Sequence, residues 1–197
     1  MQQNAVIEVG SRRHGPSRRH AALIAIAGLC AAFAGPARAE VSTDDLQAIA
    51  RTLGFLETLP IDGTLAVKVV YAPTQPDAAN VANETAGKLN AIPGPNAATF
   101  KAKSLPVDGL AADQDRLDIL LLAPGTCSDT AAAAPILDAV RRRRVVSIAS
   151  DPTCLDAQCC VLMVRAGRKV EIVLDKALAD SAGLKFASVF SMMGKRK

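Results

Sequence analysis

Residues 117–150 contain two apolar runs with a helical segment between them. Leu117–Ala123 reads LDILLLA and Val145–Ser150 reads VVSIAS. Nearly continuous apolar runs of this length are typical of strands that are covered on both faces of a parallel sheet. The segment between them, Thr130–Arg142, is predicted to be a helix in which Pro135 either delays the start or causes a kink. A strand, a helix and a strand in this order predict an α/β fold.

The residues before these runs add two helices and two strands to the prediction. Ser42 is placed to cap a helix in which apolar residues recur from Leu46 to Leu53 at the spacing of one buried face. Thr64–Tyr71, TLAVKVVY, is rich in β-branched residues and is predicted to be a strand. Asp77–Asn90 is predicted to be a helix, and Thr99–Ser104 a second, more exposed strand.

The residues after the apolar runs predict a different local structure. Cys160–Arg165 and Lys169–Leu174 flank a turn that contains Gly167, the pattern of a β-hairpin. Asp175 is placed to cap a short helix over Lys176–Ala182. A last amphipathic helix with the solvated tail Lys195-Arg196-Lys197 is expected from four apolar residues: Phe186, Val189, Phe190 and Met193.

Together these elements predict a single-domain α/β sandwich over residues 40–197, with a mostly parallel sheet and an antiparallel C-terminal hairpin. Half of the chain is apolar, which suits one domain with a substantial core. Only 3% of the residues are aromatic and none is tryptophan, so the core has to be built from Val, Leu, Ile and Ala.

Residues 1–39 have the layout of a cleaved signal peptide. Four arginines between Arg12 and Arg19 precede the apolar run Ala21–Ala34, and Ala37-Arg38-Ala39 places small residues where the signal peptidase requires them. The run is too short for an ordinary membrane span. We therefore expect cleavage between Ala39 and Glu40 and a mature domain in a bacterial periplasm.

The charge and histidine content of the mature domain exclude several function classes. Removing the leader's five arginines and one glutamate from 23 basic and 19 acidic residues leaves eighteen of each. A neutral domain lacks the basic footprint of a nucleic-acid-binding protein. Both histidines, His14 and His20, lie in the leader. A Ser-His-Asp triad, a Cys-His dyad and a His-ligated metal site are thus excluded. Catalysis through carboxylates, Lys or Cys stays open, but the usual proton shuttle at neutral pH is absent, and we expect no enzyme activity and no cofactor.

Four cysteines remain in the mature domain: Cys127, Cys154, Cys159 and Cys160. An even number in an exported protein indicates disulfides, and four cysteines allow three pairings. Because Cys159 and Cys160 would point to opposite faces of a strand, only one of them could meet Cys154. The alternative is a redox or metal site. A redox site requires a C-x-x-C motif at a helix N-terminus, whereas here the spacing differs and a loop is expected.

Other candidate binding residues have two interpretations each. Arg141–Arg144 could contact acidic lipid or an acidic partner, although cations at a helix C-terminus are common because they complement the helix dipole. Pro124-Gly125-Thr126 follows a predicted parallel strand, where α/β folds often bind ligands. Five acids could supply paired carboxylates, but their spacing selects no pair and solvated loop acids are the default: Asp113, Asp115, Asp118, Asp151 and Asp156.

Several segments of the chain resemble the YfiR-like family of periplasmic regulators. Phe55–Pro60 (FLETLP) resembles the family's Phe…Trp-Pro helix end, with Leu in place of Trp. Ser147–Pro152 (SIASDP) resembles its late Ser-Asp-x-Pro segment. Glu171–Asp175 and Ala179–Leu184 match the spacing of its closing hairpin and Gly-Leu turn. The resemblance covers most of residues 40–197.

The resemblance implies a regulator instead of a catalyst. The prototype of this family binds the periplasmic part of an inner-membrane diguanylate cyclase and holds it inactive, which restrains cyclic-di-GMP signalling and biofilm formation. The resemblance also implies a Cys154–Cys160 disulfide, and Cys127 with Cys159 is the further pair that we expect. A homodimer is a further expectation. The alternatives are a periplasmic protein that binds a small ligand near Pro124–Cys127 and a thiol oxidoreductase.

Overall fold

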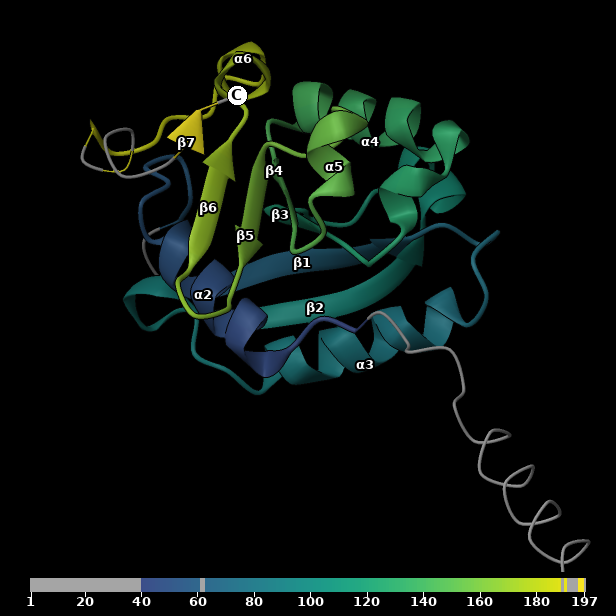
Figure 1. The fold of residues 1–197 in the computed structure, drawn as a ribbon, viewed down its shortest axis with the longest axis horizontal. Coiled ribbons are helices and arrows are strands. Elements are labelled where there is room, and N and C mark those ends of the chain that lie inside the picture. Colours follow the sequence, from purple (N-terminus) through teal and green to yellow (C-terminus); the bar gives the residue numbers. More distant parts are fainter. Residues whose placement is uncertain (1–39, 61–62, 189, 191–194, 197) are drawn as a thin grey trace, which may run out of the picture. The chain divides into compact units, whose positions relative to one another are not determined.

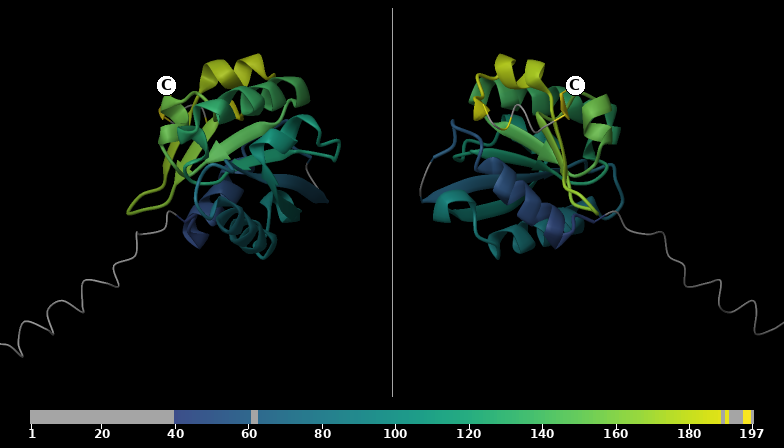
Figure 2. Two further views of the ribbon diagram at one scale, coloured as in Figure 1. Left: turned by 90° about the vertical axis from the view of Figure 1, so that its right-hand side faces the viewer. Right: turned by 60° about the vertical axis from the view of Figure 1, so that its left-hand side comes forward.

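The computed structural model describes residues 40–60, 63–188, 190 and 195–196. Helices cover both faces of one sheet, with α2 and α3 on one face and α4 and α6 on the other (Figures 1 and 2). The helices are α2 (Thr43–Leu53), α3 (Ala78–Asn90), α4 (Thr130–Arg143), α5 (Thr153–Asp156) and α6 (Lys176–Ser181), with short 3₁₀ turns η2 (Pro95–Ala97), η3 (Val107–Ala111) and η4 (Thr126–Ser128). The strands are β1 (Thr64–Tyr71), β2 (Thr99–Pro106), β3 (Ile119–Leu122), β4 (Val146–Ala149), β5 (Leu162–Arg165), β6 (Glu171–Leu174) and β7 (Lys195–Arg196).

The sheet has the strand order β2-β1-β3-β4-β5-β6-β7. All neighbouring strands pair in parallel except β5 and β6, which form the predicted antiparallel hairpin. The predicted α/β fold with a mostly parallel sheet is therefore confirmed. Because β1 lies between β2 and β3, the chain reverses its direction of winding at β1, as in other doubly wound folds.

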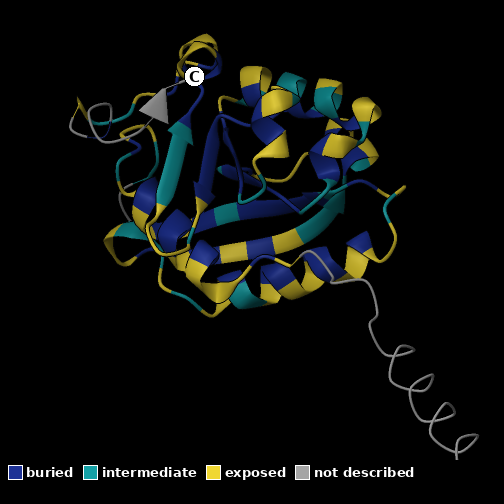
Figure 3. Ribbon diagram, viewed as in Figure 1, coloured by how far each residue is buried: buried dark blue, intermediate teal, exposed yellow. Residues whose placement is uncertain are grey.

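The core is built around the two apolar runs from which the fold was predicted. Every residue of β3 and β4 is buried (Figure 3). Ile119, Leu120, Leu121, Leu122 and Ile148 are each at most 2% exposed. Aliphatic side chains from the middle strands thus replace the aromatic residues that the composition lacks, in agreement with the prediction.

Helix α2 is fixed at its start by a capping box. The Ser42 hydroxyl accepts a hydrogen bond from the Asp45 N–H at 3.0 Å, and the Asp45 carboxylate accepts one from the Ser42 N–H at 3.2 Å. The Asp45 carboxylate also accepts a hydrogen bond from the Ala166 N–H at 2.6 Å. One buried side chain therefore satisfies the helix start and joins α2 to the tip of the β5–β6 hairpin.

Helix α4 runs without a break from Thr130 to Arg143, with Pro135 inside it. The alternative of a late start at Pro135 is therefore wrong. Asp129 caps the helix by accepting a hydrogen bond from the Ala131 N–H at 2.9 Å. At the other end Arg144 takes the left-handed conformation, with φ of 55°. A cap at each end fixes the helix length despite the proline.

Ser188 and Phe190 are helical, in agreement with the predicted last helix, but Phe186 and the predicted solvated tail differ from the prediction. Phe186 forms an isolated antiparallel bridge with Leu56. Phe190 stacks on Phe186 and on Phe55, with ring centroids 5.2 and 5.5 Å apart. Lys195–Arg196 pairs in parallel with β6 as the edge strand β7, whereas the sequence predicts a tail outside the sheet. Val189 and Met193 lie outside the described residues.

The expected signal peptide and Ala39 lie outside the described residues, which begin at Glu40. The exposed Glu40 carboxylate forms an ion pair with Lys88 of α3. In the part of the chain that the structure describes, no helix combines the length and apolar character needed to cross a bilayer.

Gly87 offers a test of the helix assignment. It lies on the exposed side of α3, and a Cβ atom added there would meet no atom within 4 Å. We expect Gly87→Ala to raise the free energy of unfolding by about 1 kcal/mol, because alanine loses less backbone entropy than glycine when a helix forms. Chemical denaturation of both proteins checks this value. A lower stability would mean that this position is not in a solvent-facing helix interior.

Candidate functional site

Two disulfides join the loops that follow β3 and β4. Cys127 is bonded to Cys159 and Cys154 to Cys160, the pairs named above. The structure thus confirms the expectation that these four cysteines form disulfides. Because Cys154 lies between Cys127 and Cys159 in the sequence, the two rings overlap and each bridge restrains the loop that the other closes. Such bridges fit a protein that folds in an oxidising compartment such as the periplasm or the cell exterior.

The backbone around the disulfides differs from the predicted loop in one respect. Cys154 lies in the one-turn helix α5, and the Cys159 N–H donates a hydrogen bond to its carbonyl oxygen at 2.9 Å. Both Cys159 and Cys160 precede β5, which begins at Leu162. The expectation that these two cysteines point to opposite faces of a strand therefore does not apply. Outside a strand the adjacent cysteines reach different partners.

All four cysteines are buried. Cys159 and Cys160 are fully buried, Cys154 is 1% exposed and Cys127 is 9% exposed. Thiol–disulfide exchange requires an attacking thiolate to reach a sulfur atom of the bridge. Burial of both bridges hinders that approach, and this favours a structural role over the oxidoreductase alternative.

The carboxyl ends of β1 and β3 are linked by the chain's own side chains. The Thr126 hydroxyl donates a hydrogen bond to the Val70 carbonyl oxygen at 3.2 Å. Gln75 approaches Gly125, whose φ of 77° favours glycine. The predicted ligand-binding residues Pro124-Gly125-Thr126 thus lie at the expected switch point, and the chain's own atoms fill part of the space that a ligand would use.

A hydrogen bond also links the loops that follow β1 and β3. The Thr74 hydroxyl donates to Asp129 Oδ2 at 2.6 Å. This bond, together with the one from the Ala131 N–H, lowers the pKa of Asp129 below its ordinary value of 3.8. The carboxylate is therefore ionised at neutral pH and is engaged as a helix cap.

A second group of polar side chains surrounds Lys68 on β1. Lys68 is 6% exposed, and its Nζ donates hydrogen bonds to Asp113 Oδ1 at 3.0 Å and to Asp115 Oδ2 at 2.9 Å. Arg143 of α4 donates to the Asp113 carbonyl oxygen at 3.1 Å and also to the Asp115 carbonyl oxygen. We call these four residues the Lys68 cluster. It ties β1, the loop before β3 and the end of α4 together.

The electrostatics of the Lys68 cluster favour the charged forms of Lys68 and Asp115. Desolvation opposes the charged form of Lys68, but the hydrogen bonds and charges of Asp115 and Asp113 outweigh it and raise the lysine pKa above its ordinary 10.5. The hydrogen bond from Lys68 and its charge, with a contribution from Lys103, lower the pKa of Asp115 below 3.8. A lysine that keeps its proton at neutral pH is not a nucleophile, so the cluster stabilises the fold instead of forming a covalent intermediate.

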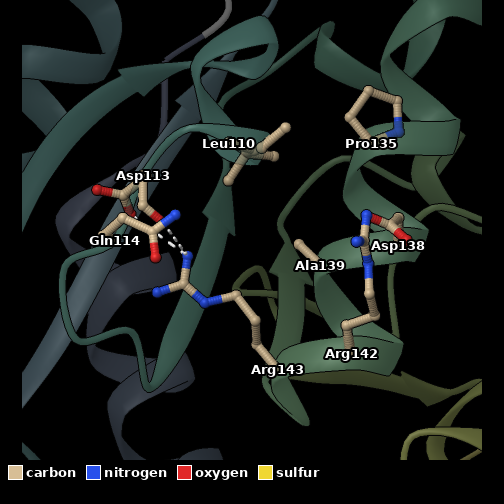
Figure 4. Close-up of a pocket in the computed structure, with 9 residues that line it drawn as sticks. Leu110, Asp113, Gln114, Pro135, Asp138, Ala139, Arg142 and Arg143 are labelled. Atoms are coloured by element: carbon tan, nitrogen blue, oxygen red, sulfur yellow. Dashed lines mark hydrogen bonds and ion pairs between the residues drawn. The ribbon is translucent and has the colours of Figure 1, made fainter.

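A cavity of about 270 Å³ lies between η3 and α4, next to the Lys68 cluster (Figure 4). Arg143 reaches across it to Asp113, 3.5 Å away, whereas Arg142 forms an ion pair with Asp138 on its own helix (Figure 4). Leu110 and Pro135 supply apolar lining. The run Arg141–Arg144 thus lies at the C-terminal end of α4, as expected if its cations complement the helix dipole. Arg143 in addition joins α4 to the loop before β3.

The five candidate acids have different surroundings in the structure and do not all belong to one group. Asp113 and Asp115 join the Lys68 cluster, and Asp118 accepts a hydrogen bond from the Ala66 N–H at 2.8 Å. Asp151 accepts hydrogen bonds from the Thr153 and Gly125 N–H groups at 3.0 and 3.4 Å. The default of solvated loop acids is therefore wrong for Asp113 and Asp118, because their charges are matched within the fold. Asp156 is exposed, as expected.

Lys68 has no local sequence signal that marks it as a member of a polar cluster. A single lysine in TLAVKVVY looks like an outward-facing position of a strand, and its partners lie 45 and 47 residues further along the chain. Only the arrangement of β1 beside β3 brings them together. Among the residues that the structure describes, no three His, Cys, Asp or Glu side chains are grouped to hold a metal ion.

In comparisons with known proteins, no family model matches the chain and no curated protein matches it.

Proposed function

We propose that this protein is a periplasmic, non-enzymatic regulator that binds the periplasmic part of an inner-membrane diguanylate cyclase and holds it inactive. In this proposal residues 1–39 direct export and are removed between Ala39 and Glu40. The observation that supports a binding role best is the pair of crossed, buried disulfides, Cys127–Cys159 and Cys154–Cys160. The partner class comes from the resemblance to the YfiR-like family.

The crossed disulfides favour protein binding because they hold an exposed segment in one conformation. Pro152, Thr153 and Gln158 are exposed around the buried cysteines. Their backbone has little freedom to lose on binding, because the chain is bonded at Cys154, Cys159 and Cys160. A pre-organised surface of this kind binds a partner at a smaller entropic cost than a flexible loop.

The hairpin that follows the bridged segment supplies an apolar contact. Val170 lies between the turn and β6. Among the described residues it is the large apolar side chain that is exposed to solvent, with an exposed fraction of 50%. Exposed apolar side chains contribute to protein interfaces when a partner removes them from water. We assign the contact with the cyclase to the bridged segment around Thr153 and to the hairpin residue Val170.

The test is deletion of the gene followed by measurement of cellular cyclic-di-GMP. We expect the deletion to raise cyclic-di-GMP, because the cyclase is no longer restrained. Wild-type protein should restore the low level, and Thr153→Arg with Val170→Asp should fail to restore it because bulk and charge disrupt the contact. Gly87→Arg, which places the same new charge as Thr153→Arg on exposed α3, is the matched control and should restore it.

Each result of this experiment has a defined meaning. Unchanged cyclic-di-GMP in the deletion strain, with the protein present in the wild-type strain by immunoblot, would contradict the regulatory function and favour the small-ligand alternative. The deletion could raise cyclic-di-GMP and the Thr153→Arg, Val170→Asp protein, present at normal abundance, could still restore the low level. In that case the regulatory function stands and the assigned surface is wrong. Co-purification of the cyclase with the wild-type protein from solubilised membranes checks the physical contact.

A further inference from the structure

The face of β1 and β2 opposite α3 contains a groove of about 420 Å³. Its floor comes from alternate residues of β1, which the parallel register places beside Lys101 and Lys103 of β2. Phe100 and Ala102, the alternating residues of β2, are buried on the side of α3. The groove is lined by Thr64, Ala66, Val67, Lys68, Lys101, Lys103, Asp115 and Arg116.

The groove carries a surplus of positive charge. Lys68 and Arg143 are balanced by Asp113 and Asp115 within the Lys68 cluster. Arg116 is balanced by Asp118, at 3.1 Å. Lys101 and Lys103 are exposed, and both contribute to lowering the pKa of Asp115 through their charge. These two lysines therefore provide the positive charge that remains after every carboxylate around the groove is matched.

The outer edge of β2 is blocked near the middle of the groove. The Asn90 side chain, at the end of α3, donates a hydrogen bond to the Ala102 carbonyl oxygen at 3.1 Å and accepts one from the Ala102 N–H at 2.6 Å. A peptide that added a strand to the sheet would need these same backbone groups. A ligand of this region is therefore directed to the open face, where Lys101 and Lys103 lie, and away from the edge.

The spacing of the two lysines favours an extended ligand. Residues two apart on a strand project from the same face about 7 Å apart. Carboxylates at alternate positions of an extended peptide have the same spacing, so each ammonium group can pair with a carboxylate of its own, whereas a single small anion would have to be shared between them. We propose that the groove binds an extended acidic segment of a partner protein, with its alternate carboxylates facing Lys101 and Lys103.

This surface goes beyond the proposed function because it lies apart from the bridged segment. The groove begins at Thr64, the start of β1, whereas Cys127 and Cys154 follow the carboxyl ends of β3 and β4. These are opposite ends of a parallel sheet, so both surfaces are available at the same time. The acidic segment can belong to the cyclase or to another protein, and the assignment of the groove does not depend on which.

The test measures binding of fluorescein-labelled peptides to the purified protein, expressed from its full-length gene, by fluorescence anisotropy. The probes are a ten-residue peptide of alternating Glu and Thr and a peptide of the same composition with all Glu residues in one block. At about 20 mM salt we expect the alternating peptide to bind more tightly, and at about 150 mM salt both to bind more weakly. Lys101→Gln with Lys103→Gln should weaken binding of the alternating peptide roughly tenfold.

The matched control is Arg168→Gln with Lys169→Gln, which removes two exposed positive charges from the hairpin turn. We expect it to change the affinity less than about twofold, because charges outside the groove act only at long range. Equal weakening by both double variants, no binding at low salt, or no preference for the alternating peptide would each overturn the proposal. Displacement of the peptide by inorganic phosphate at the same molar charge would instead show a site for small anions, which also overturns it. None of these results depends on the cyclase.

Discussion

Replacing both Cys127 and Cys159 by alanine is expected to lower the free energy of unfolding by about 4 kcal/mol. The bridge joins residues 32 apart in the sequence, so its loss restores a large amount of conformational freedom to the unfolded chain. The Cys154–Cys160 bridge joins residues only six apart in the sequence, and its removal is expected to cost about 2 kcal/mol. Urea denaturation of both double variants measures the two values.

The comparison between the two bridges isolates the effect of ring size. Both pairs are buried, and each double variant replaces two cysteines by alanine, so the loss of packed atoms is similar. We expect the variant without Cys127–Cys159 to have the lower denaturation midpoint. If removal of the Cys154–Cys160 bridge lowers the free energy of unfolding as much as removal of Cys127–Cys159, the chain-entropy account of these disulfides would be wrong. Their packing would then dominate.

Lys68→Met is expected to lower the free energy of unfolding by about 2 to 3 kcal/mol. The substitution removes the ammonium group and leaves the buried Asp113 carboxylate with Arg143, at 3.5 Å, as its remaining cation. Removal of one partner of a buried ion pair typically costs about 3 to 5 kcal/mol. The Arg143 charge and the exposure of Asp115 reduce this cost. Lys103→Met, on exposed β2, is the control and should change stability by less than about 0.5 kcal/mol.

The pH dependence of stability provides a separate test of the Lys68 cluster. Because the folded pKa of Lys68 is raised, its stabilisation is fully present below pH 10.5 and is lost as the pH rises through the higher folded value. Because the pKa of Asp115 is lowered, its stabilisation is present above pH 3.8 and is lost as the pH falls through the lower folded value. The stability difference between wild type and Lys68→Met should therefore be flat between these limits and shrink outside them. A difference that grows above pH 10.5 would contradict the assignment.

The parts of the fold that depend on local pattern could be predicted from the sequence. The buried strands β3 and β4, the helix between them and the antiparallel hairpin each have an apolar periodicity or a turn residue that indicates the element. The position of β1 between β2 and β3 has no such local signal, because it depends on where the chain crosses the sheet. The pairing of β7 with β6 also lacked a signal, since Lys195–Arg196 has neither strand propensity nor an apolar face.

The candidate site illustrates the same difference between local and distant contacts. The cysteines could be identified by their number, and the resemblance named one of their pairs. Lys68 and Asp113 could not be joined in advance, because 45 residues separate them and the carboxylate is buried only when the loop before β3 folds against α4. The capping box at Ser42 involves residues three apart and is visible in the sequence for that reason.

The crossing of the two disulfides also determines how the chain responds to proteolysis. Every peptide bond from Cys127 to Cys159 is spanned by the Cys127–Cys159 bridge, and the bond between Cys159 and Cys160 is spanned by the Cys154–Cys160 bridge. A protease that cuts the chain once anywhere in this region therefore produces two fragments that stay covalently joined. Damage by a single cleavage in a compartment rich in proteases would leave the nicked domain as one molecule until a reductant separates its halves.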